Sequence, residues 1–213
     1  MLKDIERALD SFRDQLNTAE DDFDMWRRSS GYKPKFLIQE TLLLLWPKGI
    51  WFSQATPKFA FMAWLATRGR LSTMDRVSQW SQGIDTSCVL CKNTPESQNH
   101  LFFECSFSAQ VWEHLVKGIL QNSYTAEWTG IKILLVDRNL ERYKLLCTRY
   151  AFQAAVYAIW RERNRRMHGE PPLPTQALMK LVDKGMRNKL SLIKLHGWKR
   201  FEGILQFWFA TRV

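Results

Sequence analysis

The chain has 213 residues, 46% of them hydrophobic and 24% charged, with ten tryptophans, 13 phenylalanines and a formal net charge of +10. The aromatic content excludes an intrinsically disordered protein, and the longest apolar run, residues 42–46, is too short to span a bilayer. Residues 1–16 carry charges every few positions and lack the apolar stretch of a secretory signal. We therefore expect an intracellular protein of the nucleus or cytoplasm, not a secreted one, with reduced cysteines.

Apolar residues spaced three or four apart predict a mainly α fold. In the N-terminal part, this spacing predicts an amphipathic helix over residues 2–16 and a second helix over residues 37–46, stopped by Pro47. Pro57 suits the first turn of a third helix, which we expect to reach residue 68.

A further helix is expected before the cysteine-rich segment. Ser72 or Thr73 can cap its N-terminus, and Val77 and Trp80 are placed on its buried side. Gly83 is expected to end it.

The C-terminal half has three predicted helices. They cover residues 106–120, about 139–167 and about 175–195, and Thr175 is expected to cap the last of them. Residues 121–137 are interpreted as a connection. The predicted fold is therefore a helical domain with a small metal-stapled loop in the middle and a basic helical C-terminal region.

The loop contains a cluster of metal-binding residue types. Cys88 and Cys91 are separated by two residues, His100 follows after eight more, and Cys105 follows after another four. Three thiolates and one imidazole complete a closed tetrahedral shell, which is typical of a structural zinc ion and leaves no position for a catalytic water. We expect one structural zinc; unmetallated buried thiols or a disulfide are the alternatives.

Two other features near the C-terminus are given structural interpretations. Cys147 lies inside a predicted helix with no partner nearby in sequence and is expected to be a buried core thiol. His168-Gly169-Glu170 matches the His-x-Glu element of zinc deaminases, but the Cys-x-x-Cys pair precedes it, whereas in deaminases it follows. We therefore expect no deaminase site.

Many positions around the cysteines form a further pattern. Its members are Trp51, Phe52, Pro57, Lys58, Phe61, Trp64, Leu65, Ala66, Arg70, Leu71, Ser72, Thr73, Asp75, Arg76, Trp80, Glu96, Ser97, Leu101, Phe102, Phe103, Val111 and Trp112. With the four candidate ligands, this pattern resembles the zinc-binding domain of plant reverse transcriptases encoded by LINE-type, non-LTR retrotransposons. Residues 24–32 and 159–164 resemble the segments flanking that domain. The resemblance implies that Cys88, Cys91, His100 and Cys105 bind zinc, and it implies no catalytic residue.

The resemblance suggests three regions: an N-terminal helical segment and linker (1–45), the zinc-binding domain of reverse-transcriptase type (46–120) and a basic helical region (121–213). The Tyr/Phe-x-Asp-Asp pair of a polymerase is not found, nor are endonuclease or RNase H motifs. We therefore expect a protein that is not an enzyme.

The positive charge is concentrated at the C-terminal end, since residues 138–213 hold 16 Lys and Arg against five Asp and Glu, a net +11. This favours nucleic acid, RNA or DNA, as a partner ahead of a membrane surface. The candidate contact residues are Trp160, Arg161, Arg163, Arg165, Arg166, Lys184, Arg187 and Lys189. Cations that complement a helix C-terminus, or a solvated face that also includes Lys180 and Lys194, are the alternatives.

The remaining aromatic side chains are expected in the core rather than on a base-stacking surface; these are Trp51, Phe61, Trp64, Trp80, Phe102, Phe103 and Trp112. Glu96 is a candidate to cap or orient a loop near the metal. The leading hypothesis is a non-catalytic zinc module that binds nucleic acid. The alternatives are a zinc-shaped scaffold for a protein partner, such as a reverse transcriptase, and a transposon remnant without present function.

Overall fold

The computed structural model describes residues 48–81 and 83–212, and this part of the chain is mainly helical, as the sequence predicts. Within it there is no strand, and a β-bridge joins Ser87 to Pro95. None of the helices described is both long enough and apolar enough to cross a membrane. The predicted helices at 2–16 and 37–46, the region 1–45 and the flanking resemblance at 24–32 all lie outside the described residues.

The helical segments follow one another along the chain with short connections. They are α3 (Pro57–Thr67), α4 (Met74–Val77), a π-helical turn (His100–Glu104), α5 (Ser106–Leu120), a 3-10 turn (Gln121–Ser123), α6 (Trp128–Val136), α7 (Arg142–Met167), α8 (Thr175–Leu195), a second 3-10 turn (Lys199–Phe201) and α9 (Ile204–Ala210).

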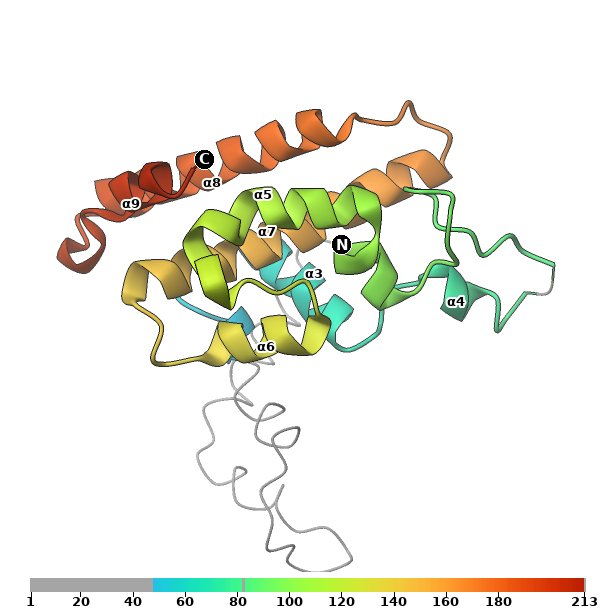
Figure 1. Ribbon diagram of the computed structural model, residues 1–213, viewed down its shortest axis with the longest axis horizontal. Helices are drawn as coiled ribbons and strands as arrows, with labels where there is room; N and C mark the ends of the chain where they lie inside the picture. The colour runs from blue at the N-terminus through green and yellow to red at the C-terminus, as the bar shows by residue number, and fades with distance from the viewer. Residues whose placement is uncertain (1–47, 82, 213) are drawn as a thin grey trace, which may run out of the picture. The chain divides into compact units, whose positions relative to one another are not determined.

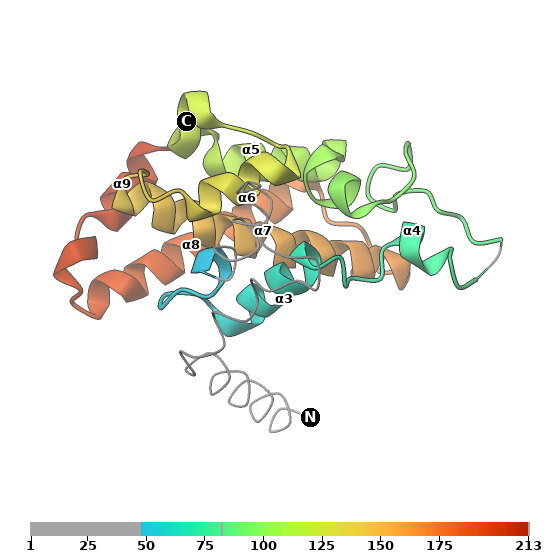
Figure 2. The same cartoon turned by 90° about the horizontal axis from the view of Figure 1, so that it is seen from below.

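Helix α7 is the central element of this arrangement (Figures 1 and 2), because it packs against α3, α5, α6, α8 and α9. Residues 150–156 are all buried, so this part of the helix is covered on every side. Cys147 is fully buried in the same helix, as predicted. A helix that contacts so many neighbours fixes the position of any element attached to it.

The core is built around packed aromatic rings. The Phe103 ring lies 5.3 Å from that of Trp112, 5.1 Å from that of Trp128 and 5.9 Å from that of Phe152, measured between centroids. Phe102 is also buried. The prediction of core positions is thus confirmed for Phe102, Phe103 and Trp112.

The same prediction is wrong for three other aromatic residues, since Trp51, Phe61 and Trp80 are 38%, 43% and 66% exposed. For Phe61 the reason lies in α3, which buries its small face of Ala60, Ala63 and Ala66. Alanines allow α3 to approach α7 closely, so Phe61 is directed outward, where it stacks on the half-buried Trp64.

Residues 121–137, interpreted from sequence as a connection, contain helix α6, so that interpretation is wrong. The Glu127 side chain caps this helix by accepting hydrogen bonds from the backbone N–H groups of Thr129 and Gly130. Trp128, Ile131 and Leu135 form its buried face. In the sequence, α6 is thus indicated by a capping residue followed by apolar residues at helical spacing.

The end of α4, the cap of α8 and the segment after Gly197 also differ from expectation. Helix α4 ends at Val77 rather than Gly83, which leaves Trp80 outside it, and Thr73 occupies its cap position without a side-chain hydrogen bond. Thr175 is the first residue of α8, and Pro174 takes the cap position. Beyond Gly197 the chain forms α9, whose Trp208 is fully buried and donates a hydrogen bond to Asp183 of α8.

Candidate metal centre

The first half of the metal loop is a tight turn closed by backbone hydrogen bonds. The Cys88 N–H donates to the Thr94 carbonyl and the Lys92 N–H to the Cys88 carbonyl, both at 2.8 Å. Lys92 adopts a left-handed conformation with φ of 61°, which reverses the chain directly after Cys91. The turn therefore holds Cys88 and Cys91 on the same side of the loop.

The second half of the site lies in the π-helical turn that precedes α5. The Cys105 N–H donates to the His100 carbonyl at 2.7 Å, so the wider turn closes over five residues rather than four. Cys105 is then the N-cap residue of α5. This geometry brings two side chains that are five positions apart to one side of the turn.

The two halves meet in a cluster of four donor atoms, one from each of Cys88, Cys91, His100 and Cys105, all within 4.8 Å of one another. The Sγ atoms of Cys88 and Cys105 are 3.9 Å apart, and Cys91 Sγ is 3.3 Å from His100 Nε2. Tetrahedral zinc, with its usual bond lengths, requires about 3.8 Å between sulfurs and about 3.6 Å between sulfur and nitrogen. The donor set and its spacing fit zinc.

The protonation of the thiols is set by their contact. The hydrogen bond with Cys105, together with burial, raises the pKa of Cys88 well above its usual range, while the same hydrogen bond lowers the pKa of Cys105. Of these two thiols, Cys105 therefore loses its proton more readily. Zinc binds thiolates, so loading the site releases protons from the thiols that still carry them.

Glu96 connects the loop to the rest of the fold. Its side chain is fully buried and accepts hydrogen bonds from the Met74 N–H at 2.9 Å and from Nη2 of Arg163 at 2.8 Å. It therefore caps α4 and holds the metal loop against α7 at once. The sequence interpretation of Glu96 as a capping or orienting residue agrees with this position.

A second link joins the loop to α7 through Arg166. Its Nη1 donates to the carbonyl of Leu90, between the two cysteines of the turn, at 3.1 Å. Its Nε donates to the buried carboxylate of Glu162 at 2.8 Å, and its Nη2 donates to the Leu173 carbonyl at 3.0 Å. Arg166 thus ties together the metal loop, α7 and the segment that leads into α8.

The cations proposed from sequence as nucleic-acid contacts therefore fall into two groups. Arg163 is buried against Glu96, Arg166 is mostly buried, and Arg165 pairs with Glu162 and Glu170. Trp160 is half-buried, and the Arg163 guanidinium lies over its ring. The second group, Arg161, Lys184, Arg187 and Lys189, lies mostly on the surface.

In that second group, Arg161 and Lys184 are exposed, and neither has a hydrogen-bond or ion-pair partner among the residues the structure describes. Arg187 pairs with Asp183 at 2.9 Å but stays exposed. Lys189 is half-buried with its Nζ over the Tyr150 ring, and burial lowers its pKa.

The His-x-Glu element does not join the cluster. Gly169, with φ of 76°, ends α7, and Glu170 pairs with Arg165 at 2.7 Å. The metal-type cluster found in the described part of the chain includes neither His168 nor Glu170. This placement agrees with the interpretation of the element as a helix end.

The fold and the cluster define a mainly α protein with a Cys3His metal-binding loop. Residues 25–112 match a family model described as zinc-binding in reverse transcriptase, which confirms the resemblance at the level of this domain. The match contains all four cluster residues and ends within α5, so Arg163 and Arg166 lie beyond it. No curated protein and no solved structure matches the chain.

Proposed function

We propose that the chain is a non-catalytic module, stabilised by one structural zinc ion, that binds single-stranded nucleic acid. Its derivation from a LINE-type retrotransposon of plants is part of the same proposal, and the match to a zinc-binding family of reverse transcriptases supports it. The binding surface is placed on α8, not on the metal loop. The observation that carries it is the charge of that helix.

Helix α8 contains five cations, Lys180, Lys184, Arg187, Lys189 and Lys194, against the single acid Asp183. Lys180, Lys184, Arg187 and Lys194 are exposed and follow one another at helical spacing, so they form a stripe along one side of the helix. Asp183 pairs with Arg187 and accepts a hydrogen bond from Trp208, so it offsets one cation of the stripe and leaves Lys180, Lys184 and Lys194 without an acidic partner among the described residues. Phosphate groups spaced along a strand are the ligands that such a stripe attracts.

The proposal is tested by fluorescence anisotropy with a labelled single-stranded RNA at about 50 mM and about 200 mM salt, because counterion release makes phosphate binding fall steeply as salt rises. We expect binding at the lower concentration and a marked loss at the higher one. Absence of binding at the lower concentration would refute the proposal.

A charge-reversal pair locates the surface. Lys180→Glu combined with Lys184→Glu should weaken binding and reduce the slope of log affinity against log salt by about 1.4, or about 0.7 for each lost phosphate contact. The matched control combines Lys48→Glu with Arg138→Glu, two exposed cations outside α8, and changes net charge equally. Equal losses in both double variants would show that only total charge matters.

A second candidate function is supported by a separate observation on α8. Leu192 and Leu195 are 53% and 80% exposed near the end of the helix, where apolar side chains of this kind are typical of a surface for a protein partner. Under this alternative the zinc shapes a scaffold for a polypeptide such as a reverse transcriptase. The RNA titration separates the two, because a scaffold gives no salt-sensitive RNA binding.

A further inference from the structure

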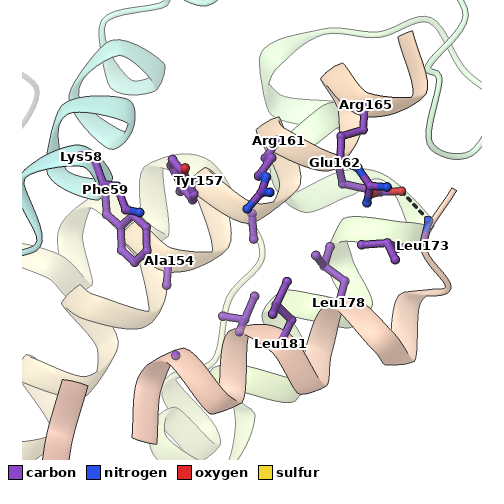
Figure 3. A pocket seen from close by; sticks show the side chains of 13 residues that line it. Lys58, Phe59, Ala154, Tyr157, Arg161, Glu162, Arg165, Leu173, Leu178 and Leu181 are labelled. Carbon is purple, nitrogen blue, oxygen red and sulfur yellow. Dashed lines mark hydrogen bonds and ion pairs between the residues drawn. The ribbon is translucent and has the colours of Figure 1, made fainter. Parts of the chain in front are cut away.

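A groove of about 390 Å³ lies between α3, α7 and α8 (Figure 3). One wall carries Phe59 from α3 and Tyr157 from α7, and the opposite wall carries Leu178 and Leu181 from α8. Its volume is within the range of pockets that enclose small planar ligands. The groove is outside the metal centre and outside the residues proposed from sequence, apart from Arg161 and Arg165.

The aromatic wall is held in place by packing. The rings of Phe59 and Tyr157 lie 4.6 Å apart between centroids at an angle of 37°, and Lys58 Nζ is 5.4 Å from the centroid of each. Preformed aromatic surfaces of this kind stack on bases of any sequence.

Cations border the groove on both walls. On the side of α3 and α7 these are Lys58 and Arg161, and Figure 3 shows Arg161 extending from α7 toward α8. On the other side, Lys184 lies one helical turn after Leu181, which lines the groove, so the two side chains are neighbours on the surface of α8. A phosphate bound at Lys184 would therefore lie beside the groove.

The acidic group that lines the groove is already neutralised. Glu162 is buried and accepts hydrogen bonds from Arg165, Arg166 and the Leu173 N–H. An anionic ligand therefore meets unpaired cations at the groove edge and no uncompensated carboxylate among the lining residues.

We propose that this groove receives an unstacked base of a single-stranded nucleic acid whose phosphates lie on the α8 stripe and Arg161. This inference rests on the proposed function and specifies its ligand: an apolar, aromatic interior suits a base, and cations on both walls suit the phosphates on either side of it. A duplex keeps its bases paired and stacked, so it cannot fill the groove without extruding one.

The test compares two substitutions on the same helix. Leu181→Asp places a negative charge in the groove, and Leu192→Asp makes the same change at a leucine of nearly equal exposure, 53% against 54%, that does not line it. We expect Leu181→Asp to weaken binding of a single-stranded RNA by about 5- to 150-fold relative to Leu192→Asp, the loss of one stacked base. Circular dichroism and zinc content should be unchanged in both variants.

The possible outcomes are distinct. If the unaltered protein does not bind single-stranded RNA, both the proposed function and this inference fail. If it binds and the two variants lose affinity equally, the groove is not used, although the stripe on α8 can still be. The inference would also be overturned in favour of a protein ligand by two results together: an acidic peptide binds in the groove, and Leu181→Asp leaves RNA binding unchanged.

Photocrosslinking gives a readout that does not depend on a substitution. RNA containing 4-thiouridine should form adducts on the peptides that carry Phe59 or Tyr157, identified by mass spectrometry. Adducts restricted to other segments would contradict placement of a base in the groove.

Discussion

The Glu96 carboxylate and the Arg163 guanidinium form a buried ion pair across 67 positions of the chain, with side chains that are 0% and 7% exposed. Nε of Arg163 lies 3.2 Å from each carboxylate oxygen, and Nη2 lies 2.8 Å from one of them. The pair joins the metal loop to α7, which lies beyond the residues matched by the zinc-binding family. In this protein, the environment of the metal loop is therefore completed by the C-terminal half.

This ion pair predicts that Arg163→Met has a large effect on the stability of the protein. Removing the guanidinium leaves a buried carboxylate without a counter-charge, which should lower the free energy of unfolding by about 3–5 kcal/mol. Urea unfolding of the zinc-loaded protein measures it. Arg161→Met, two positions away on an exposed side chain, is the control and should change stability by less than about 0.5 kcal/mol. Adding Glu96→Gln to Arg163→Met removes the unpaired charge, so the double variant should recover part of the lost free energy of unfolding.

The cysteines should react with a thiol reagent in a definite order. Cys147 is fully buried, and burial raises its pKa to about 12, so it stays protonated and unreactive in the folded chain. With zinc bound, Cys88, Cys91 and Cys105 are expected to be protected; a chelator should expose them, and Cys147 should react only on unfolding. Early labelling of Cys147, detected by peptide mass spectrometry, would contradict its burial in the core.

The same thiol predicts a pH dependence of stability. The pKa of Cys147 is about 12 in the folded chain against 9.0 in its ordinary environment. The folded chain thus holds the thiol proton more tightly than the unfolded chain does. The contribution of this thiol to the free energy of unfolding is therefore complete below about pH 9 and decreases as the pH rises from there toward 12. Thermal unfolding of the protein and of Cys147→Ala between these pH values should show a smaller decline for the variant. Parallel curves would assign the decline to other groups.

Gly118 is expected to be essential for the docking of the C-terminus on α5. A Cβ atom at this position would collide with the backbone carbonyl oxygen of Thr211, just after α9. Gly118→Ala should therefore destabilise the protein and loosen α9, measured by hydrogen exchange. Gly185→Ala is the matched helical control, since a Cβ there meets nothing within 4 Å, and helix propensity alone should stabilise it by about 0.5–1 kcal/mol.

Local patterns in the sequence predict much of the fold. The bounds of α5 and α8 follow from apolar spacing, with Gly197 just beyond α8, and the cysteine and histidine spacing predicts which four side chains meet. Helix α6 escapes prediction because it is short and its cap is Glu127, a less common capping residue than Ser, Thr, Asp or Asn.

Roles that depend on distant partners are not available from local patterns. The sequence places Arg161, Arg163, Arg165 and Arg166 in one basic cluster, yet helical geometry directs them to different surroundings. Arg163 meets Glu96 and Arg166 meets Leu90, contacts that no spacing within the helix indicates. Trp80 is likewise of a residue type that is common in cores, but it is exposed. Helix α4 ends at Val77, earlier than the apolar spacing of the segment suggests, so Trp80 lies beyond it.

The proposed zinc site underlies both the fold of the loop and the proposed function, and native mass spectrometry of the whole chain tests it directly. We expect one zinc ion in the unaltered protein and in Cys147→Ala, which changes a buried thiol outside the cluster. Cys88→Ser and His100→Ala, one from each half of the site, should lose the ion. Zinc retained in both of these variants, or absent from the unaltered protein, would contradict the assignment of the site.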